Sequence, residues 1–237
     1  MTKGTINKAL TVFLIFILGS VKLYCQSNGT ASLKDALIIK RISLPLNFDG
    51  IPDDEAWKEI EPLNIIMHSP VFGKEPTEKT DTRIAFDDKY LYVVSKQFYE
   101  KPEMIQSVSL KRDYMGMGGD WFGVILDTYN DKENGLAFFT SPDGLRWDAA
   151  ILKDAVTQLP DQLPMNISWN TFWDVITKKG SIGWSLEMRI PFSSLRFQEI
   201  NGEVRMGLII KRWIPSKNEL KNSTRKRQKT IRIMKLN

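Results

Sequence analysis

Apolar and polar residues alternate along much of the chain with a period of two, which is typical of β-strands. The clearest run is Trp184 to Phe192 (WSLEMRIPF), where every second residue is apolar and Glu187 and Arg189 lie between them. This pattern predicts a strand with one face in the core and a second face on which Glu187 is solvated or salt-bridged. Asp120 to Tyr129 (DWFGVILDTY) is apolar on both faces, which predicts a central strand covered on each side.

Further strands are predicted between turn signals such as Asp49-Gly50 and Pro142-Asp143-Gly144. Thr80 to Tyr99 indicates a hairpin that turns at Asp87 to Lys89. The remaining strand-like runs are Ile42–Phe48, Leu136–Thr140, Arg146–Lys153, Phe172–Thr177 and Arg205–Ile214. The segment PDDEAWKEI predicts one or two helical turns. Together these runs predict an all-β protein, an antiparallel β-sandwich of the jelly-roll or immunoglobulin-like type with about nine or ten strands.

The two ends of the chain differ from its body. Lys3 and Lys8 precede the apolar run Ala9 to Leu18, so residues 1–25 are predicted to be a signal peptide, with an uncleaved anchor or lipidation of Cys25 as alternatives. Residues 26–40 form a polar lead-in, residues 41–214 the sandwich, and residues 215–237 a basic tail that we expect to be disordered. We therefore expect an exported protein of the periplasm, outer membrane or cell surface.

The net charge of +5 arises from the ends of the chain. Three lysines lie in the first 25 residues, and eight basic residues against one glutamate follow Ile214, so the body between them is mildly acidic. A nucleic-acid-binding surface needs clustered cations that displace counterions from phosphates. Nucleic acid is therefore not an expected partner.

Several kinds of chemistry are excluded by the residue types present. His68 is the only histidine and Cys25 the only cysteine, so thiol chemistry and zinc sites have no suitable ligand set. We expect His68 on the surface or in a loop, and the glycine-rich stretch Met115 to Asp120 as a mobile loop, because it leads into a strand instead of a helix. A glycosidase with two carboxylates remains a weaker alternative, since acidic residues are abundant.

The tryptophans carry the most information about a ligand, because an indole face can stack on the C–H groups of a sugar. Trp57, Trp121 and Trp184 lie in apolar patterns and are predicted to be core residues. Trp147, Trp169 and Trp173 lie in polar contexts (RWDA, SWN and FWD), so they are predicted to form a sugar-binding platform, although packing in the core is the competing interpretation. The polar residues assigned to this site are Arg112, Arg146 and Asp148.

Acidic residues near turns could also hold a structural metal ion. Asp127, Asp131 and Asp143 are the predicted ligands, and calcium is the expected ion, because it takes several oxygen ligands and suits exported domains without disulfides. No EF-hand spacing occurs.

The order of the motifs FDGIPDDEAWKEI, TDTRIAFDDKYLYV, DWFGVILDTYND, GLRWDA and GWSLEMRIPFSSLRF resembles the family 9-like carbohydrate-binding domain, over about Ile42 to Ile214. The resemblance implies a jelly-roll-like sandwich, sugars bound between two tryptophans, structural calcium, and company with glycoside hydrolases or outer-membrane β-barrel proteins. Relatives that are attached to an outer-membrane β-barrel continue with more strands after a segment like KRWIPSKNE, whereas this chain becomes basic. We therefore expect a truncated chain that has lost a C-terminal domain.

Two functions from different classes follow. The first is a non-catalytic carbohydrate-binding domain of the cell envelope, linked to carbohydrate catabolism. The alternative is an accessory domain of an outer-membrane β-barrel partner, without affinity for sugars.

Overall fold

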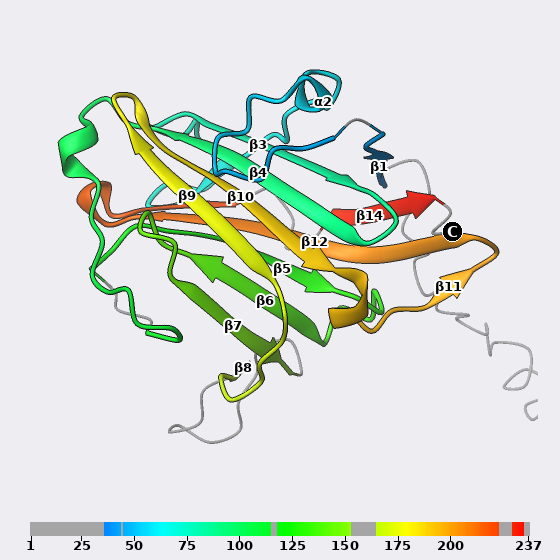
Figure 1. Ribbon diagram of the computed structural model, residues 1–237. Helices are drawn as coiled ribbons and strands as arrows, with labels where there is room; N and C mark the ends of the chain where they lie inside the picture. Colours follow the sequence, from blue (N-terminus) through cyan, green and yellow to red (C-terminus); the bar gives the residue numbers. More distant parts are fainter. Residues whose placement is uncertain (1–35, 44, 115–117, 153–164, 223–228, 235–237) are drawn as a thin grey trace, which may run out of the picture. The chain divides into compact units, whose positions relative to one another are not determined.

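The computed structural model describes residues 36–43, 45–114, 118–152, 165–222 and 229–234, and almost all of their regular structure is β (Figure 1). The only α-helix in these ranges is the short α2 (Glu55–Lys58). The strands are β1 (Leu37–Arg41), β2 (Ile66–Ser69), β3 (Thr80–Phe86), β4 (Tyr90–Phe98), β5 (Trp121–Asp127), β6 (Gly135–Thr140), β7 (Arg146–Ile151), β8 (Met165–Asn166), β9 (Asp174–Gly180), β10 (Gly183–Pro191), β11 (Glu199–Ile200), β12 (Glu203–Ile214), β13 (Glu219–Asn222) and β14 (Lys229–Met234). The predicted fold class is confirmed, whereas the predicted number of strands was too low.

The strands form one continuous sheet that folds into two facing layers. The first layer contains β8, β7, β6, β5, β12 and β14, and the second contains β3, β4, β10 and β9, in these orders. β1 joins the layers, because residues 37–39 pair with β14 and residues 40–41 pair with β3, both in parallel. The other pairings are antiparallel, so the sheet is mixed at this one strand.

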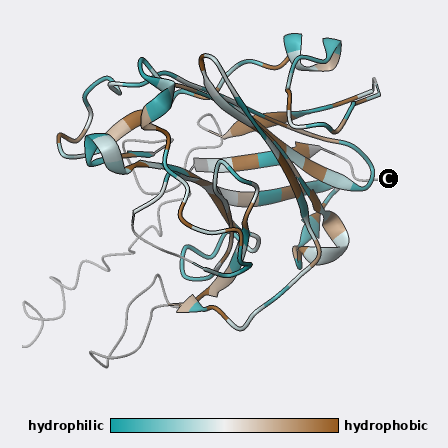
Figure 2. Ribbon diagram, turned by 60° about the vertical axis from the view of Figure 1, so that its left-hand side comes forward, coloured by the Kyte–Doolittle hydropathy of each residue, from teal (hydrophilic) through white to brown (hydrophobic). Residues whose placement is uncertain are grey.

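The core lies between the inner faces of the two layers. Hydrophobic and hydrophilic residues alternate along the strands (Figure 2), and the apolar members of β4, β5, β10 and β12 form one buried cluster. In β10 the residues Trp184, Leu186, Met188 and Ile190 are all at most 3% exposed, which confirms the period-two prediction. The predicted core positions of Trp57 and Trp121 are also confirmed.

Glu187 lies on the outer face of β10 but is buried and has no ion pair among the described residues, so the prediction of a solvated or salt-bridged side chain is wrong. Its Oε2 atom accepts hydrogen bonds from the backbone N–H groups of Asp49 (2.8 Å) and Gly50 (2.9 Å). The turn after Phe48 therefore packs over this face of the sheet, and burial raises the pKa of Glu187. Sequence alternation identifies the face of a residue but not the loops that cover it.

Part of the predicted disordered tail belongs to the sheet. β13 pairs with β12 and β2, and β14 lies between β12 and β1. Ile231 and Ile233 of β14 are fully buried in the main core. The prediction failed because the short alternating run from Lys229 to Met234 lies among basic residues, which were interpreted as a solvated segment. β1 likewise begins inside the predicted polar lead-in.

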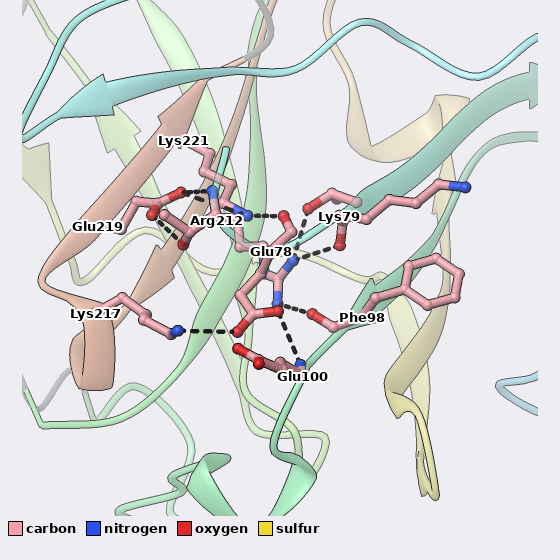
Figure 3. A network of polar contacts seen from close by, with 10 residues as sticks. Glu78, Lys79, Phe98, Glu100, Arg212, Lys217, Glu219 and Lys221 are labelled. Atoms are coloured by element: carbon pink, nitrogen blue, oxygen red, sulfur yellow. Dashed lines mark hydrogen bonds and ion pairs between the residues drawn. The ribbon is translucent and has the colours of Figure 1, made fainter. Parts of the chain in front are cut away.

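A network of buried charges attaches β12 and β13 to the chain segment before β3 (Figure 3). Arg212 donates hydrogen bonds to the backbone oxygens of Lys79 (2.9 Å) and Phe98 (3.1 Å), and Lys221 donates to that of Glu78. Lys221 is fully buried, and desolvation lowers its pKa to about 7. Because buried charges are costly without partners, these contacts require the segment from Glu78 to remain against β13.

The predicted signal peptide, residues 1–25, lies outside the described residues. Among the helices that are described, none has the length and apolar character to cross a membrane.

Candidate functional site

Two of the three predicted platform tryptophans do not face solvent. Trp147 and Trp173 are each 2% exposed, so the prediction that their rings stand open to a sugar is wrong. Trp169, the third, is half-buried at the edge of the core.

The strand geometry of β7 explains the burial of Trp147. Successive side chains of a strand point to opposite faces, so Arg146 and Asp148 lie on the inner face while Trp147 lies on the outer one. There Trp147 packs edge-on against Phe139 of β6, with ring centroids 5.6 Å apart. The polar neighbours in RWDA therefore belong to the other side of the sheet, and they do not indicate an exposed ring.

Trp173 is a core residue immediately before β9. Its ring packs edge-on against Phe138 with a centroid separation of 5.5 Å, and its backbone oxygen accepts a hydrogen bond from Arg146 Nη1 at 2.9 Å. Trp169 contacts the same phenylalanine at 6.0 Å. The two indoles and Arg146 thus hold the loop before β9 against the core.

The structure does bring Arg112 and Asp148, both predicted ligand residues, together at the inner face of β7. Asp148 is fully buried, and its two oxygens accept hydrogen bonds from Arg112 Nη2 (2.6 Å) and the backbone N–H of Thr171 (2.9 Å). The same Arg112 nitrogen donates to Asn170 Oδ1 at 2.5 Å. A buried carboxylate therefore fixes a guanidinium group and the loop from Asn170 in one geometry.

An exposed aromatic ring adjoins this polar cluster. Phe172 is 86% exposed, more than any other large apolar side chain in the described ranges. Its backbone is held on both sides, because Thr171 is bonded to Asp148 and the Phe172 oxygen accepts a hydrogen bond from Ser194 Oγ at 2.7 Å. Tyr114, next to the Arg112 segment, is 45% exposed.

Sequence reasoning missed Phe172 and Asn170. Phe172 and Trp173 both precede β9, so strand alternation does not assign their faces. The predicted platform rested on indole rings and therefore did not include a phenylalanine. The contact between Arg112 and Asn170 joins residues 58 positions apart and has no local signal.

We call the cluster of Arg112, Asp113, Asp148, Asn170, Thr171 and Phe172 the Arg112 site. It offers little for acid–base catalysis. Asp113 and Asp148 are its carboxylates, and Asp148 is fully buried with both oxygens occupied. A glycosidase needs two carboxyl groups that both reach the scissile bond. The arrangement suits binding and not hydrolysis.

The three predicted calcium ligands do not form one site. Asp127 ends β5 beside the start of β6, whereas Asp143 follows the end of β6, about 17 Å away along that strand. Asp127 and Asp131 accept backbone hydrogen bonds within their own loop, and Asp143 pairs with Lys179 at 2.5 Å. In the described ranges no group of three or more His, Cys, Asp or Glu side chains could hold a metal ion.

Comparison of the chain with protein-family models and with curated protein sequences gives no match. Solved structures do match. A family 9 carbohydrate-binding module from Caldicellulosiruptor kristjanssonii, solved with cellotriose, has a TM-score of 0.54 at 16% identity over 84% of this chain and 94% of its own. The same kind of module solved with glucose gives a TM-score of 0.55 at 16% identity, over 84% and 96%.

A candidate carbohydrate-binding protein from Bacteroides uniformis has a TM-score of 0.60 at 10% identity, over 84% of this chain and 99% of its own. These matches, each over 84% of the chain, show that it has the fold of family 9 carbohydrate-binding modules. They confirm the fold part of the resemblance seen in the sequence.

Proposed function

We propose that this chain is a non-catalytic carbohydrate-binding domain, and that the Arg112 site binds the sugar. The observation that carries the proposal is an exposed Phe172 ring beside a fixed guanidinium and amide, on a fold shared with modules solved with glucose and cellotriose. Sugars are bound in this way elsewhere, by an aromatic face and planar hydrogen-bonding groups.

The polar groups of the site are arranged to meet hydroxyl groups. Within the described chain, Arg112 Nη1 and Asn170 Nδ2 have no hydrogen-bond partner, while Nη2 and Oδ1 of the same residues are bonded to each other. This pair therefore has two donors without a partner among the described residues. Because Asp148 holds Arg112 in place, little conformational entropy is lost when a hydroxyl group is bound.

The expected affinity is modest. Covering about 100 Å² of the Phe172 ring contributes roughly 2.5 kcal/mol at 25 cal/mol per Å². Hydrogen bonds add to this, and loss of ligand freedom and desolvation subtract from it. A dissociation constant in the range of about 10 μM to 1 mM follows.

Calorimetric titration of the full-length chain with glucose and cellotriose tests the proposal. Phe172→Ala and Asn170→Ala should weaken binding about tenfold or abolish it. Phe72→Ala is the matched control, because Phe72 is also exposed (54%) but lies in the turn after β2. Absence of heat with any mono- or oligosaccharide, or equal binding by all four proteins, would overturn the proposal.

Export to the cell envelope is part of the proposed function and is supported by the basic and apolar pattern of residues 1–25. Cell fractionation with mass spectrometry of the mature N-terminus tests it. An unprocessed chain in the cytoplasm would contradict it.

A further inference from the structure

The outer face of the second layer, on the side opposite the core, has two cavities that share Lys96, and we refer to them together as the groove. The loop from Phe48 to Ile60 covers part of this face and is held there by Glu187 and by Ser185 Oγ, which donates to the Gly50 oxygen at 2.6 Å. Two cavities remain, one on each side of the loop segment from Ile51 to Asp54. Both cavities contact Lys96 of β4.

The larger cavity, of about 260 Å³, lies over β4, β9 and β10. Its walls are mostly apolar. Phe98 lies on the outer face of β4, and Ile51 (41% exposed) and Ile182 (61% exposed) stand at its rim. Apolar side chains open to solvent around a concavity are typical of a ligand site.

The charges of this cavity have one sign. Lys96, Lys178 and Lys179 contribute to its lining, and no acidic residue does. Lys179 already forms an ion pair, at 2.5 Å, with Asp143, which does not line the cavity. Lys96 and Lys178 form no ion pair with any described residue, and Lys96 is half-buried. A cation held partly out of water beside an apolar wall favours an anionic partner.

The smaller cavity, of about 210 Å³, continues from Lys96 toward α2. Its floor contains the ion pair of Arg83 Nε with Asp81 Oδ1 at 3.0 Å, and Trp57 lines its wall. Asp53, Asp54 and Lys58 line the same cavity, so apart from Lys96 it carries three carboxylates against two cations. The net positive charge of the groove therefore lies in the larger cavity, with Lys96 and Lys178.

We propose that this groove is a second ligand site, separate from the Arg112 site, that binds a small carboxylate with an apolar body. The carboxylate pairs with Lys96, and the apolar part packs against Phe98 and Ile182. An aromatic acid of about 12 to 15 non-hydrogen atoms matches the cavity, which is at the small end of ligand pockets. A simple hexose fits less well, because its hydroxyl groups would meet mainly apolar walls.

Displacement of 8-anilinonaphthalene-1-sulfonate from the full-length chain, followed by fluorescence, tests the proposal. Naphthalene-2-carboxylate should displace the dye at least tenfold better than the neutral naphthalene-2-methanol, a factor that corresponds to about 1.4 kcal/mol. Lys96→Gln should remove this preference for the acid, and Ile182→Ser should weaken both competitors.

Lys89→Gln is the matched control, since Lys89 is an exposed lysine at the opposite end of β4. In dye displacement it should match the wild type, and cellotriose should not displace the dye. Equal displacement by acid and alcohol, or a preference for the acid that survives Lys96→Gln, would overturn the proposal. Displacement by cellotriose would assign the dye to the sugar site and would also overturn it. These outcomes do not depend on whether the Arg112 site binds sugar.

Discussion

The strand β14 should contribute strongly to stability although it lies among basic residues. We expect Ile233→Ala to destabilise the protein by about 3 kcal/mol, because deletion of a fully buried isoleucine side chain costs about 2–5 kcal/mol. Ile231→Ala should cost a similar amount. The two side chains share one core, so the double variant should lose about 4–6 kcal/mol, no more than the sum of the single losses.

Urea unfolding followed by tryptophan fluorescence measures this effect. With a slope of about 2.5 kcal/mol per M, each single variant should unfold at a urea concentration lower by about 1 M. Thr230→Ala is the matched control, because Thr230 is only half-buried and lies on the opposite face of β14. Its midpoint should move by less than about 0.3 M.

A disordered tail makes the opposite prediction. All three substitutions would then change the free energy of unfolding by less than about 0.5 kcal/mol. Unchanged midpoints for both isoleucine variants would therefore refute the assignment of β14 to the core.

Three further predictions concern buried polar groups and a turn. Burial raises the pKa of Asp120 from 3.8 to about 6, so the folded state binds more protons than the unfolded state between these values and stability should fall as pH rises from about 4 to 6. Asp120→Asn should remove this component, about 3 kcal/mol, in unfolding curves measured across that range; an unchanged pH dependence would contradict it. Arg212→Ala should lower the free energy of unfolding by about 3–5 kcal/mol, because it leaves the backbone oxygens of Lys79 and Phe98 and the Thr80 hydroxyl without their donor; a loss below about 1 kcal/mol in urea would speak against the network. Gly50→Ala should cost more than about 1 kcal/mol in thermal unfolding, since Gly50 has φ +88° and an added Cβ would lie 2.9 Å from Ile176 Cγ2; a variant as stable as the wild type would disprove this.

The sequence predicted the layers of the fold better than their edges. The hairpin of β3 and β4 and the alternation of β10 were identified because their patterns are local and long. β14 was missed because six alternating residues among basic ones give little local signal. The parallel pairings of β1 were also inaccessible, since they join residues far apart in the chain.

The candidate site was also predicted only in part, because contacts between residues far apart in the chain leave no local signal. Arg112 and Asp148 were selected and do meet. Trp147 and Trp173 were predicted to be exposed because their neighbours are polar. In a strand, however, adjacent side chains lie on opposite faces, so a polar neighbour does not indicate exposure. Strand alternation applied to the run from Trp147 to Ile151 would have predicted the burial of Trp147, whereas Phe172 and Trp173 precede β9 and lack this signal.

The position of β1 has a consequence for biosynthesis. β1 leaves the ribosome before every strand it will contact, and one of its two neighbours, β14, is translated after all the others. Until then the nascent chain presents open hydrogen-bonding edges on both β1 and β12, which is where strands from other molecules add. Protection of the growing polypeptide by chaperones should therefore matter most during the interval before the last strand emerges.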